Sequence, residues 1–144
     1  MKTVLPFFLL VFIIATSCTK EGELNFQERR LVGEWKFKKV TFTKRWTIGY
    51  RNITSDYQAD QLVFNDDLSM TYSNSETGEN YTGIWEVNCT GGQDNSSQLI
   101  ASLTHDVTGE IKQIIWDSFS TTKKKICSNS SEKEGFYNYT LIRQ

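Results

Sequence analysis

Short apolar stretches alternate with polar, turn-forming clusters along most of this chain. From residue 31 onward the stretches are rich in Val, Ile, Thr, Tyr, Phe and Trp, and Gly, Asn, Asp and Ser gather between them. No helical periodicity of about 3.6 residues stands out, so the pattern predicts an all-β domain. The expected strands are residues 31–46, 61–65, 69–75, 81–88, 98–105, 110–119, 121–128 and 136–143.

Alternation within these strands indicates which side chains face inward. Trp35 and Phe37 share one face of the first strand. Val40 and Phe42 share the other face, which predicts a bulge at residues 38–39. Strands of this length joined by short loops predict an eight-stranded, up-and-down antiparallel β-barrel, because closure removes exposed sheet edges.

The first 17 residues differ in composition from the rest. A basic start at Lys2 is followed by an apolar run over residues 4–15, and small residues precede Cys18. A membrane-spanning helix takes about 20 residues, so this shorter run predicts an export signal. The segment resembles the signal of bacterial lipoproteins, especially the Bacteroidetes type, in which the cysteine is acylated and becomes the first mature residue. An ordinary cleaved signal with an incidental cysteine is the alternative.

This resemblance implies three segments: a lipoprotein signal peptide over residues 1–17, a lipidated tether over residues 18–27, and one domain over residues 28–144. Acyl chains on Cys18 would anchor the protein in a membrane. Thr19 stands where such proteins carry Asp when they stay at the inner membrane, which indicates an outer-membrane lipoprotein, on the periplasmic face or at the cell surface. Without residues 1–17 the chain has 15 basic and 17 acidic side chains, and this balance argues against a nucleic-acid partner.

Four motifs, in their order and spacing, resemble the lipocalin-like domain of small bacterial lipoproteins. They are Leu31-Val32-Gly33-Glu34-Trp35, Leu62-Val63-Phe64-Asn65-Asp66-Asp67, Gly83-Ile84-Trp85-Glu86-Val87 and Tyr139-Thr140-Leu141-Ile142-Arg143. The resemblance implies a barrel of the calycin type over residues 28–144. It also implies structural roles for Gly33, for Trp35 at the closed end of the barrel, and for Arg143 in a cation–π contact over the Trp35 ring. The family usually has Asp-Gly in the second hairpin, where this chain has Leu68, a residue that adopts positive φ poorly.

The residue types that carry catalysis or bind metals do not gather in this sequence. His105 is the single histidine, at the end of a strand, and nothing near it resembles a nucleophile motif. No phosphate-binding glycine loop precedes a helix, and no closely spaced ligand pair suits zinc. We therefore expect no enzyme activity, no cofactor and no metal.

Two cysteines remain beside the lipidated one, Cys89 and Cys127. An oxidising compartment favours a disulfide between them. The up-and-down strand order instead places them at opposite rims of the barrel, beyond the distance of about 7 Å that a disulfide can bridge between Cα atoms. Both alternatives stay open.

The connection over residues 47–60 is the most informative segment for function. Connections of this length within a small domain are usually functional or mobile, and the strand directions place this one at the open rim. Its aromatic rings and one basic group suit an amphipathic or anionic small molecule. The expected ligand-binding residues are Trp46, Tyr50, Arg51 and Tyr57 at the mouth, and Phe37, Tyr72, Trp85, Leu103 and Tyr139 inside the barrel. The alternative is a connection that plugs the barrel, with Trp46 and Tyr57 as core residues.

These observations predict a lipid-anchored binding module of the cell envelope that holds a small hydrophobic ligand or an amphipathic one. The alternative is a protein-interaction module, such as an inhibitor or an accessory subunit, with a barrel filled by its own side chains. That alternative predicts an exposed apolar patch around Ile114 and Trp116, although the sequence indicates no particular protein partner.

Overall fold

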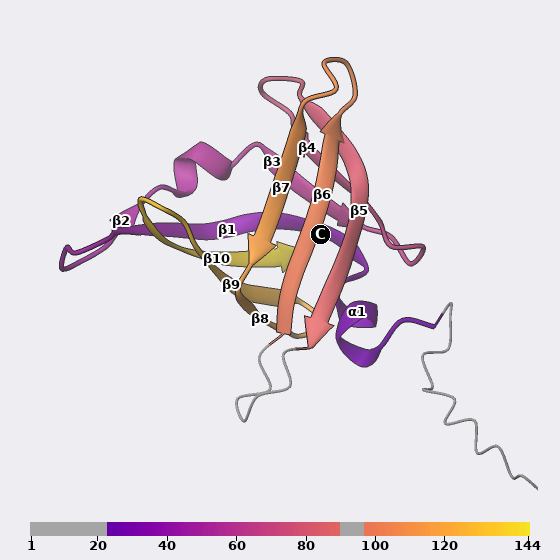
Figure 1. The fold of residues 1–144 in the computed structure, drawn as a ribbon, viewed down its shortest axis with the longest axis horizontal. Helices are drawn as coiled ribbons and strands as arrows, with labels where there is room; N and C mark the ends of the chain where they lie inside the picture. Colours follow the sequence, from indigo (N-terminus) through magenta and orange to yellow (C-terminus); the bar gives the residue numbers. More distant parts are fainter. Residues whose placement is uncertain (1–22, 90–96) are drawn as a thin grey trace, which may run out of the picture.

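The chain forms one antiparallel sheet that curls into a nearly closed barrel, as the computed structural model of residues 23–89 and 97–144 shows (Figure 1). Within these described residues, helical structure is confined to two short segments. The elements are α1 (Phe26–Leu31), β1 (Gly33–Lys44), β2 (Arg51–Asn52), the 3-10 helix η1 (Thr54–Tyr57), β3 (Asp60–Phe64), β4 (Ser69–Asn74), β5 (Asn80–Cys89), β6 (Ser97–His105), β7 (Ile111–Trp116), β8 (Ser118–Thr121), β9 (Lys125–Ser131) and β10 (Gly135–Arg143).

The strand order leaves one seam in the barrel. Neighbouring strands are hydrogen-bonded in the order β7-β6-β5-β4-β3-β1-β10-β9-β8, and β2 pairs with β1. The first and last long strands, β1 and β10, pair over almost their whole length. The two ends of the sheet, β7 and β8, are consecutive in the chain and separated only by Asp117. The barrel is therefore closed except at one seam, where β7 faces β8 and its neighbour β9 without being paired to either.

The predicted all-β class and antiparallel barrel are confirmed, but the sheet that the described residues form has ten strands rather than eight. The predicted strand 110–119 is divided at Asp117, because its first half pairs with β6 and its second half pairs with β9. The short strand β2 lies inside the connection predicted as a loop, where it pairs with β1.

The predicted bulge in the first strand is confirmed. The register between β1 and β10 shifts between Phe37 and Lys39. Trp35 is fully buried before the bulge and Val40 is fully buried after it, so the extra residue switches the inward face. This bend lets one 12-residue strand direct side chains into the barrel both before and after the bulge.

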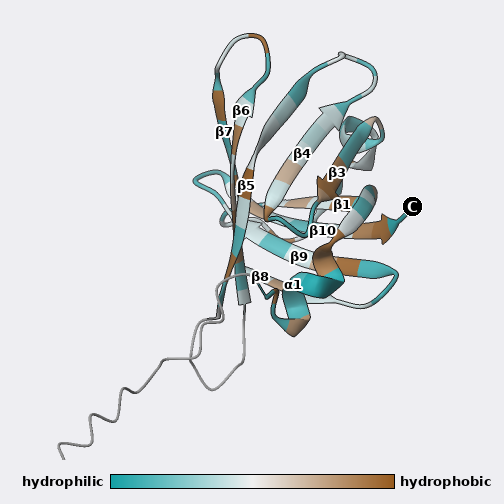
Figure 2. Ribbon diagram, turned by 90° about the vertical axis from the view of Figure 1, so that its right-hand side faces the viewer, coloured by the Kyte–Doolittle hydropathy of each residue, from teal (hydrophilic) through white to brown (hydrophobic). Residues whose placement is uncertain are grey.

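A core of large apolar side chains fills the closed half of the barrel, and Figure 2 shows apolar segments on the strands around it. Burying each such side chain stabilises the fold by about 1.5–3 kcal/mol. Trp116 belongs to this core at 2% exposure, so it cannot form part of the exposed apolar patch that the protein-interaction alternative predicts around Ile114 and Trp116, although Ile111 and Ile115 of the same strand are 72% and 41% exposed. The fully buried large side chains are Leu31, Trp35, Val40, Leu62, Phe64, Met70, Trp85, Leu99, Leu103, Trp116, Ile126 and Leu141.

Helix α1 covers the closed end, and the sequence pattern missed it. Residue 31 was expected to begin a strand, whereas Leu31 ends α1 and is fully buried. A capping box starts the helix: the Asn25 side chain accepts from the Glu28 N–H, and Glu28 accepts from the Asn25 N–H. The helix begins at Phe26, inside the segment expected as tether.

Arg143 joins this helix to the last strand, and its expected contact with Trp35 is present. Its guanidinium carbon lies 4.6 Å from the centre of the Trp35 ring. The guanidinium also donates to the carbonyls of Arg30, Val32 and Lys123, each at 2.8 Å. Gly33 has a φ of 135°, and a Cβ there would collide with the guanidinium of Arg143. Both the backbone conformation and the lack of space therefore require glycine at this position.

The hairpin between β3 and β4 uses Leu68 at a φ of 65°, the left-handed conformation that its residue type disfavours. The Asp67 carboxylate accepts from the Ser69 N–H at 2.8 Å and holds the turn. Leu68 therefore adopts a backbone conformation that glycine would adopt more readily.

The predicted lipidation site, Cys18, and the signal peptide lie outside the described residues, as does the side chain of Cys89. Cys127 is a free thiol. Within residues 23–89 and 97–144, no helix has the length and apolar character needed to cross a membrane.

Candidate functional site

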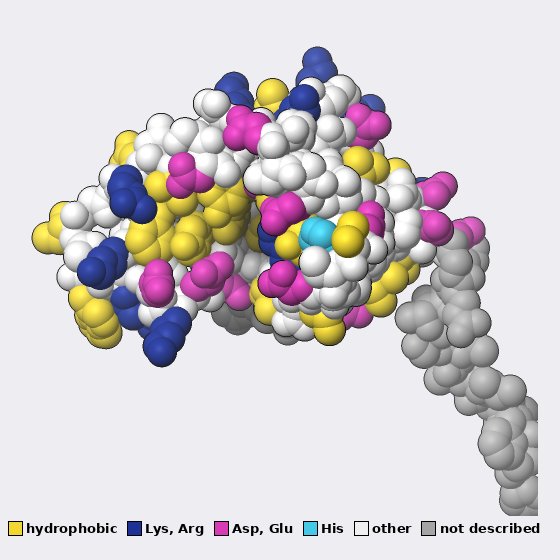
Figure 3. All heavy atoms as spheres, turned by 90° about the horizontal axis from the view of Figure 1, so that it is seen from above, with side chains coloured by type: hydrophobic (Ala, Val, Ile, Leu, Met, Phe, Trp, Pro, Cys, Tyr) yellow, Lys and Arg dark blue, Asp and Glu magenta, His cyan; other side chains and the backbone are white. Residues whose placement is uncertain are grey.

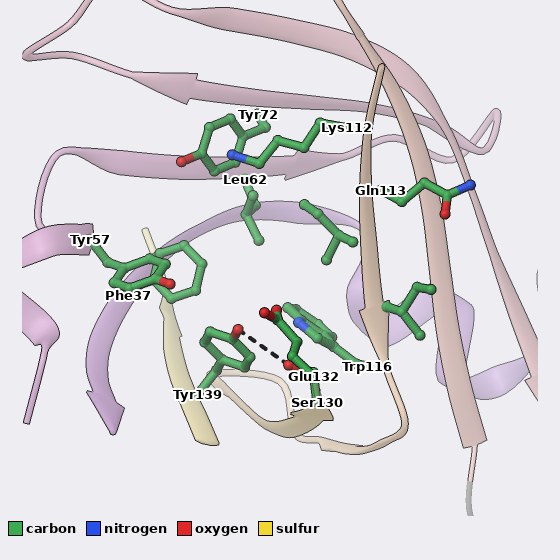
Figure 4. A pocket seen from close by; sticks show the side chains of 12 residues that line it. Phe37, Tyr57, Leu62, Tyr72, Lys112, Gln113, Trp116, Ser130, Glu132 and Tyr139 are labelled. Carbon is green, nitrogen blue, oxygen red and sulfur yellow. Dashed lines mark hydrogen bonds between the residues drawn. The ribbon is translucent and has the colours of Figure 1, made fainter. Parts of the chain in front are cut away.

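The barrel is hollow beside its seam. A hollow of about 160 Å³, here called the inner hollow, lies between β1, β3, β7, β9 and β10 (Figure 4). This volume is close to the cavity of about 150 Å³ that holds one benzene in an engineered protein. The inner hollow is lined by Phe37, Tyr57, Leu62, Tyr72, Lys112, Gln113, Ile114, Ile115, Trp116, Ser130, Glu132 and Tyr139.

A second, wider hollow of about 390 Å³, the outer hollow, shares Tyr57, Tyr72 and Lys112 with the inner one. Its volume is in the range of small-molecule sites, about 300–1,000 Å³. Seen from above, the molecule has a depression with apolar side chains at its floor and charged groups around it (Figure 3). The outer hollow is lined by Phe42, Arg51, Ile53, Asp56, Tyr57, Asp60, Tyr72, Asn74, Lys112, Glu134 and Tyr137.

The seam explains why the barrel opens here. Asp117 pins one end, because its N–H donates to the Asn129 carbonyl at 2.9 Å and its carboxylate accepts from the Ser131 N–H at 2.6 Å. Beyond that point no described strand pairs with the outer edge of β7. Side chains of β7 and of the end of β9 therefore border a gap and are not held together by a continuous ladder.

Aromatic rings from four elements meet at the inner hollow. The ring centre of Phe37 lies 5.2 Å from that of Tyr57 and 5.9 Å from that of Tyr139. Tyr139 also lies 6.1 Å from Tyr57 and 6.3 Å from Trp116. These separations are typical of packed aromatic pairs, so the rings hold one another in place around the space.

A buried carboxylate fixes the junction between η1 and β3. Asp60 is 2% exposed, and it accepts from the Tyr72 hydroxyl at 2.6 Å and from the Asn74 amide at 2.7 Å. Hydrogen bonds to a charged acceptor are among the strongest in proteins. They orient the Tyr72 ring, which forms a wall common to both hollows.

Lys112 reaches both hollows from β7. Its Nζ lies 3.7 Å from the centre of the Tyr72 ring and 5.2 Å from that of Tyr81. Burial lowers the pKa of this ammonium group, and the carboxylates of Asp60 and Glu79 oppose that shift. Within the described part of the chain, its Nζ makes these ring contacts and no hydrogen bond or ion pair.

The tyrosine hydroxyls around the space are neutral at physiological pH. Burial raises the pKa of Tyr57 to about 12. Burial also raises the pKa of Tyr72, helped by its hydrogen bond to Asp60, and the pKa of Tyr139. The Tyr139 hydroxyl lies 3.3 Å from the Ser130 hydroxyl. Neutral phenols can donate or accept, so these groups suit a polar ligand atom as well as an apolar one.

The structure brings together only part of the predicted ligand-binding set. Five of the nine residues line the inner or the outer hollow: Phe37, Arg51, Tyr57, Tyr72 and Tyr139. Tyr50, together with Arg51, lines a separate hollow of about 330 Å³ at the turn between β1 and β2. Trp85 and Leu103 are packed in the closed core and line neither hollow.

Trp46 and Tyr50 lie on the turn between β1 and β2, where they are 96% and 68% exposed. They do not reach the inner or outer hollow, because the chain folds back as β2 and directs the following residues, from Arg51 to Tyr57, over the barrel.

Three residues that line the hollows are absent from the predicted ligand-binding set: Lys112, Asp60 and Glu132. The pattern predicted a strand over residues 110–119 but left its inward face undecided, because the run Ile114, Ile115 and Trp116 is apolar on both faces. Taking the tryptophan as inward would have placed Lys112, four residues earlier, on the same face. Nothing in the sequence indicates that Asp60 is buried.

Other polar groups have structural partners. The Nδ1 atom of His105 accepts from the N–H groups of Val107 and Thr108, at 3.1 and 3.0 Å, and so shapes the turn after β6. In the parts of the chain that the structure covers, no three His, Cys, Asp or Glu side chains are placed to hold a metal ion.

No protein-family model, curated protein or solved structure matches this chain. The fold and the geometry of the two hollows are therefore the basis for assigning a function.

Proposed function

We propose that this protein is a lipid-anchored module of the cell envelope whose lipocalin-like barrel holds a small hydrophobic or amphipathic molecule. The observation that carries the proposal is the pair of hollows beside the seam, which share three lining residues and have aromatic walls and a few polar groups. Binding sites for small molecules typically combine such walls with a small number of oriented polar groups.

The two hollows suit different parts of one ligand. The inner hollow, at about 160 Å³, takes a ring or a short branched chain. The outer hollow adds about 390 Å³ and carries charged side chains, so a polar group of the ligand would lie there. Such a division favours an amphipathic molecule.

The placement of the ends of the barrel supports an anchor through the N-terminal segment. Helix α1 lies at one end of the long axis, whereas β2 and η1 lie toward the other (Figure 1). A protein held by acyl chains on Cys18, eight residues before α1, would present the hollows away from the membrane.

The proposal is tested by a ligand panel on a blocked variant. Fatty acids, haem-like dyes and environment-sensitive fluorophores are screened for an increase in Tm and for quenching of Trp116, which lines the inner hollow. Ser130 is buried in the same wall, so Ser130→Phe should fill the space with a phenyl ring. Ser120→Phe, at an exposed position on β8, is the control.

We expect at least one class of compound to raise the Tm of the wild type and of Ser120→Phe but not of Ser130→Phe. If no compound raises the Tm, or if Ser130→Phe binds as well as the wild type while remaining folded, the proposal is wrong.

A protein-interaction module is the second candidate, and one observation favours it. The turn between β1 and β2 exposes Trp46, Ile48 and Tyr50, and Trp46 has a φ of 67°. A large apolar residue held exposed in a disfavoured conformation suggests a role other than stability. This candidate predicts that the panel has no effect, and that Trp46→Asn loses a co-purifying partner with no loss of Tm.

A further inference from the structure

We infer that the two hollows select an organic cation, an ammonium or guanidinium group joined to a ring or a short alkyl chain. This inference rests on the proposed function, since it names the ligand class for the same site. It replaces the anionic molecule that the basic residue of the 47–60 connection suggested.

Acidic side chains outnumber basic ones around the hollows. Among the described residues that line them, four are carboxylates, whereas two, Arg51 and Lys112, are cations. The acidic residues come from η1, from the start of β3 and from the turn between β9 and β10: Asp56, Asp60, Glu132 and Glu134. A concave site lined by an excess of one charge concentrates ligands of the opposite charge.

The same carboxylates affect the pKa values of the tyrosines that face this space. The pKa of Tyr57, raised to about 12 mainly by burial, is raised further by Glu132 and Asp60. The pKa of Tyr137 is raised by burial and then by Glu132, and Arg51 opposes the shift. Burial, the main cause, disfavours a charge of either sign on these rings, and the carboxylates add a smaller effect that specifically disfavours a negative one.

The aromatic rings give a cation a second kind of partner. Phe37, Tyr57 and Tyr139 form a triangle with ring centres 5.2–6.1 Å apart, and Trp116 extends it. Figure 4 shows these side chains around one space, with the Glu132 carboxylate directed into it. Faces of aromatic rings attract ammonium groups, and desolvation strengthens the attraction.

Lys112 shows that this wall already accommodates an ammonium group. Its Nζ lies 3.7 Å from the Tyr72 ring centre with no carboxylate in ion-pair contact among the residues described. The ammonium group of Lys112 lies over the rings of Tyr72 and Tyr81. In the described structure no cation lies over the triangle of Phe37, Tyr57 and Tyr139. That triangle, together with Glu132, is where we place the ligand cation.

Three probes of similar size and different charge test the inference on ¹⁵N-labelled mature protein with Cys18→Ser. They are benzyltrimethylammonium, benzyl alcohol and benzenesulfonate. The indole N–H of Trp116, which lines the inner hollow, reports binding, and that of Trp46, which is 96% exposed and lines neither hollow, is the internal control.

We expect the cation to shift the Trp116 signal saturably, with an affinity at least about tenfold above those of the other two probes, which corresponds to about 1.4 kcal/mol. The Trp46 signal should not move. Glu132→Gln and Asp56→Asn should each weaken the cation about three- to tenfold and leave benzyl alcohol unchanged. Glu86→Gln is the matched control, because Glu86 is an exposed carboxylate on β5 that lines neither hollow.

Equal or tighter binding of benzyl alcohol or benzenesulfonate at Trp116 would overturn the inference and leave the proposed function standing. Cation binding that is unchanged in both acidic-residue variants would also overturn it. If none of the three probes moves the Trp116 signal, the inference is wrong, and the separate ligand panel with Ser130→Phe decides the proposed function.

Discussion

Replacement of Arg143 tests how the closed end of the barrel is held together. Its guanidinium donates hydrogen bonds to three carbonyls, on Arg30, Val32 and Lys123, and covers Trp35. Hydrogen bonds to charged groups contribute about 1.5–3 kcal/mol, and a cation–π contact about 0.5–2 kcal/mol. Because these contacts share one side chain and are partly exposed, we expect Arg143→Ala to cost about 2–4 kcal/mol in total.

A double-mutant cycle with Gly33 separates the steric contact from backbone strain. In the wild type, Gly33→Ala adds both a strained φ and a collision with the guanidinium. In the Arg143→Ala background only the backbone strain remains. The loss of unfolding free energy caused by Gly33→Ala should therefore be smaller there than in the wild type by at least about 1 kcal/mol. Gly49→Ala is the control for strain alone, because Gly49 has a φ of 99° and no atom within 4 Å of an added Cβ.

The assay is unfolding by denaturant, which gives the free energy, and by heat, which gives the Tm, each followed by tryptophan fluorescence and by circular dichroism. A loss of about 3 kcal/mol corresponds to a decrease in Tm of roughly 8–15 °C for a domain of this size. An unchanged Tm in Arg143→Ala, or costs of the two substitutions that add within about 0.5 kcal/mol, would refute the account of the closed end.

Three further substitutions or conditions have defined outcomes. Trp35 is fully buried, so Trp35→Ala should destabilise the fold by about 3–5 kcal/mol in the same unfolding assay, and an unchanged Tm would contradict this. Trp46→Asn should stabilise by about 0.5–1 kcal/mol by relieving the positive φ with almost no loss of burial, whereas Trp46→Ala should be neutral. Alkaline titration should show phenols that ionise late: because the pKa of Tyr57 is raised from its usual value to about 12, the folded state keeps its proton when the unfolded chain releases it. Stability is therefore present below about pH 10 and falls as the pH rises toward about 12, and tyrosinate absorbance that is equal in native and denaturant-unfolded protein would contradict this.

The strands were predictable because alternation has a direct physical cause. One face of each strand packs on the core, so a switch of face, as between Phe37 and Val40, signals a bulge. The division at Asp117 was not predictable from alternation, because it arises from strand pairing: the residues before it pair with β6 and those after it pair with β9. Helix α1 is too short for a periodic pattern, although its capping box, Asn25 and Glu28, is a local signal.

The candidate site was only partly predictable, because it is made by the path of the 47–60 connection. Arg51 and Tyr57 are directed to the hollows by the pairing of β2 and by η1, whereas Trp46 stays on an exposed turn. The sequence showed one basic group in this connection. The acidic excess comes from segments far apart in the chain, such as Asp56 and Glu132, and appears only once the barrel brings them together.

The central claim is that the barrel accepts a small molecule beside its seam. A crystal structure of the protein with the compound that raises its Tm most is the most direct test. We predict electron density for the compound between Phe37, Trp116 and Tyr139, continuing toward Asp56 in the outer hollow. Density only on the exposed turn at Trp46 or beside α1, with the inner hollow closed by its own side chains, would contradict the account.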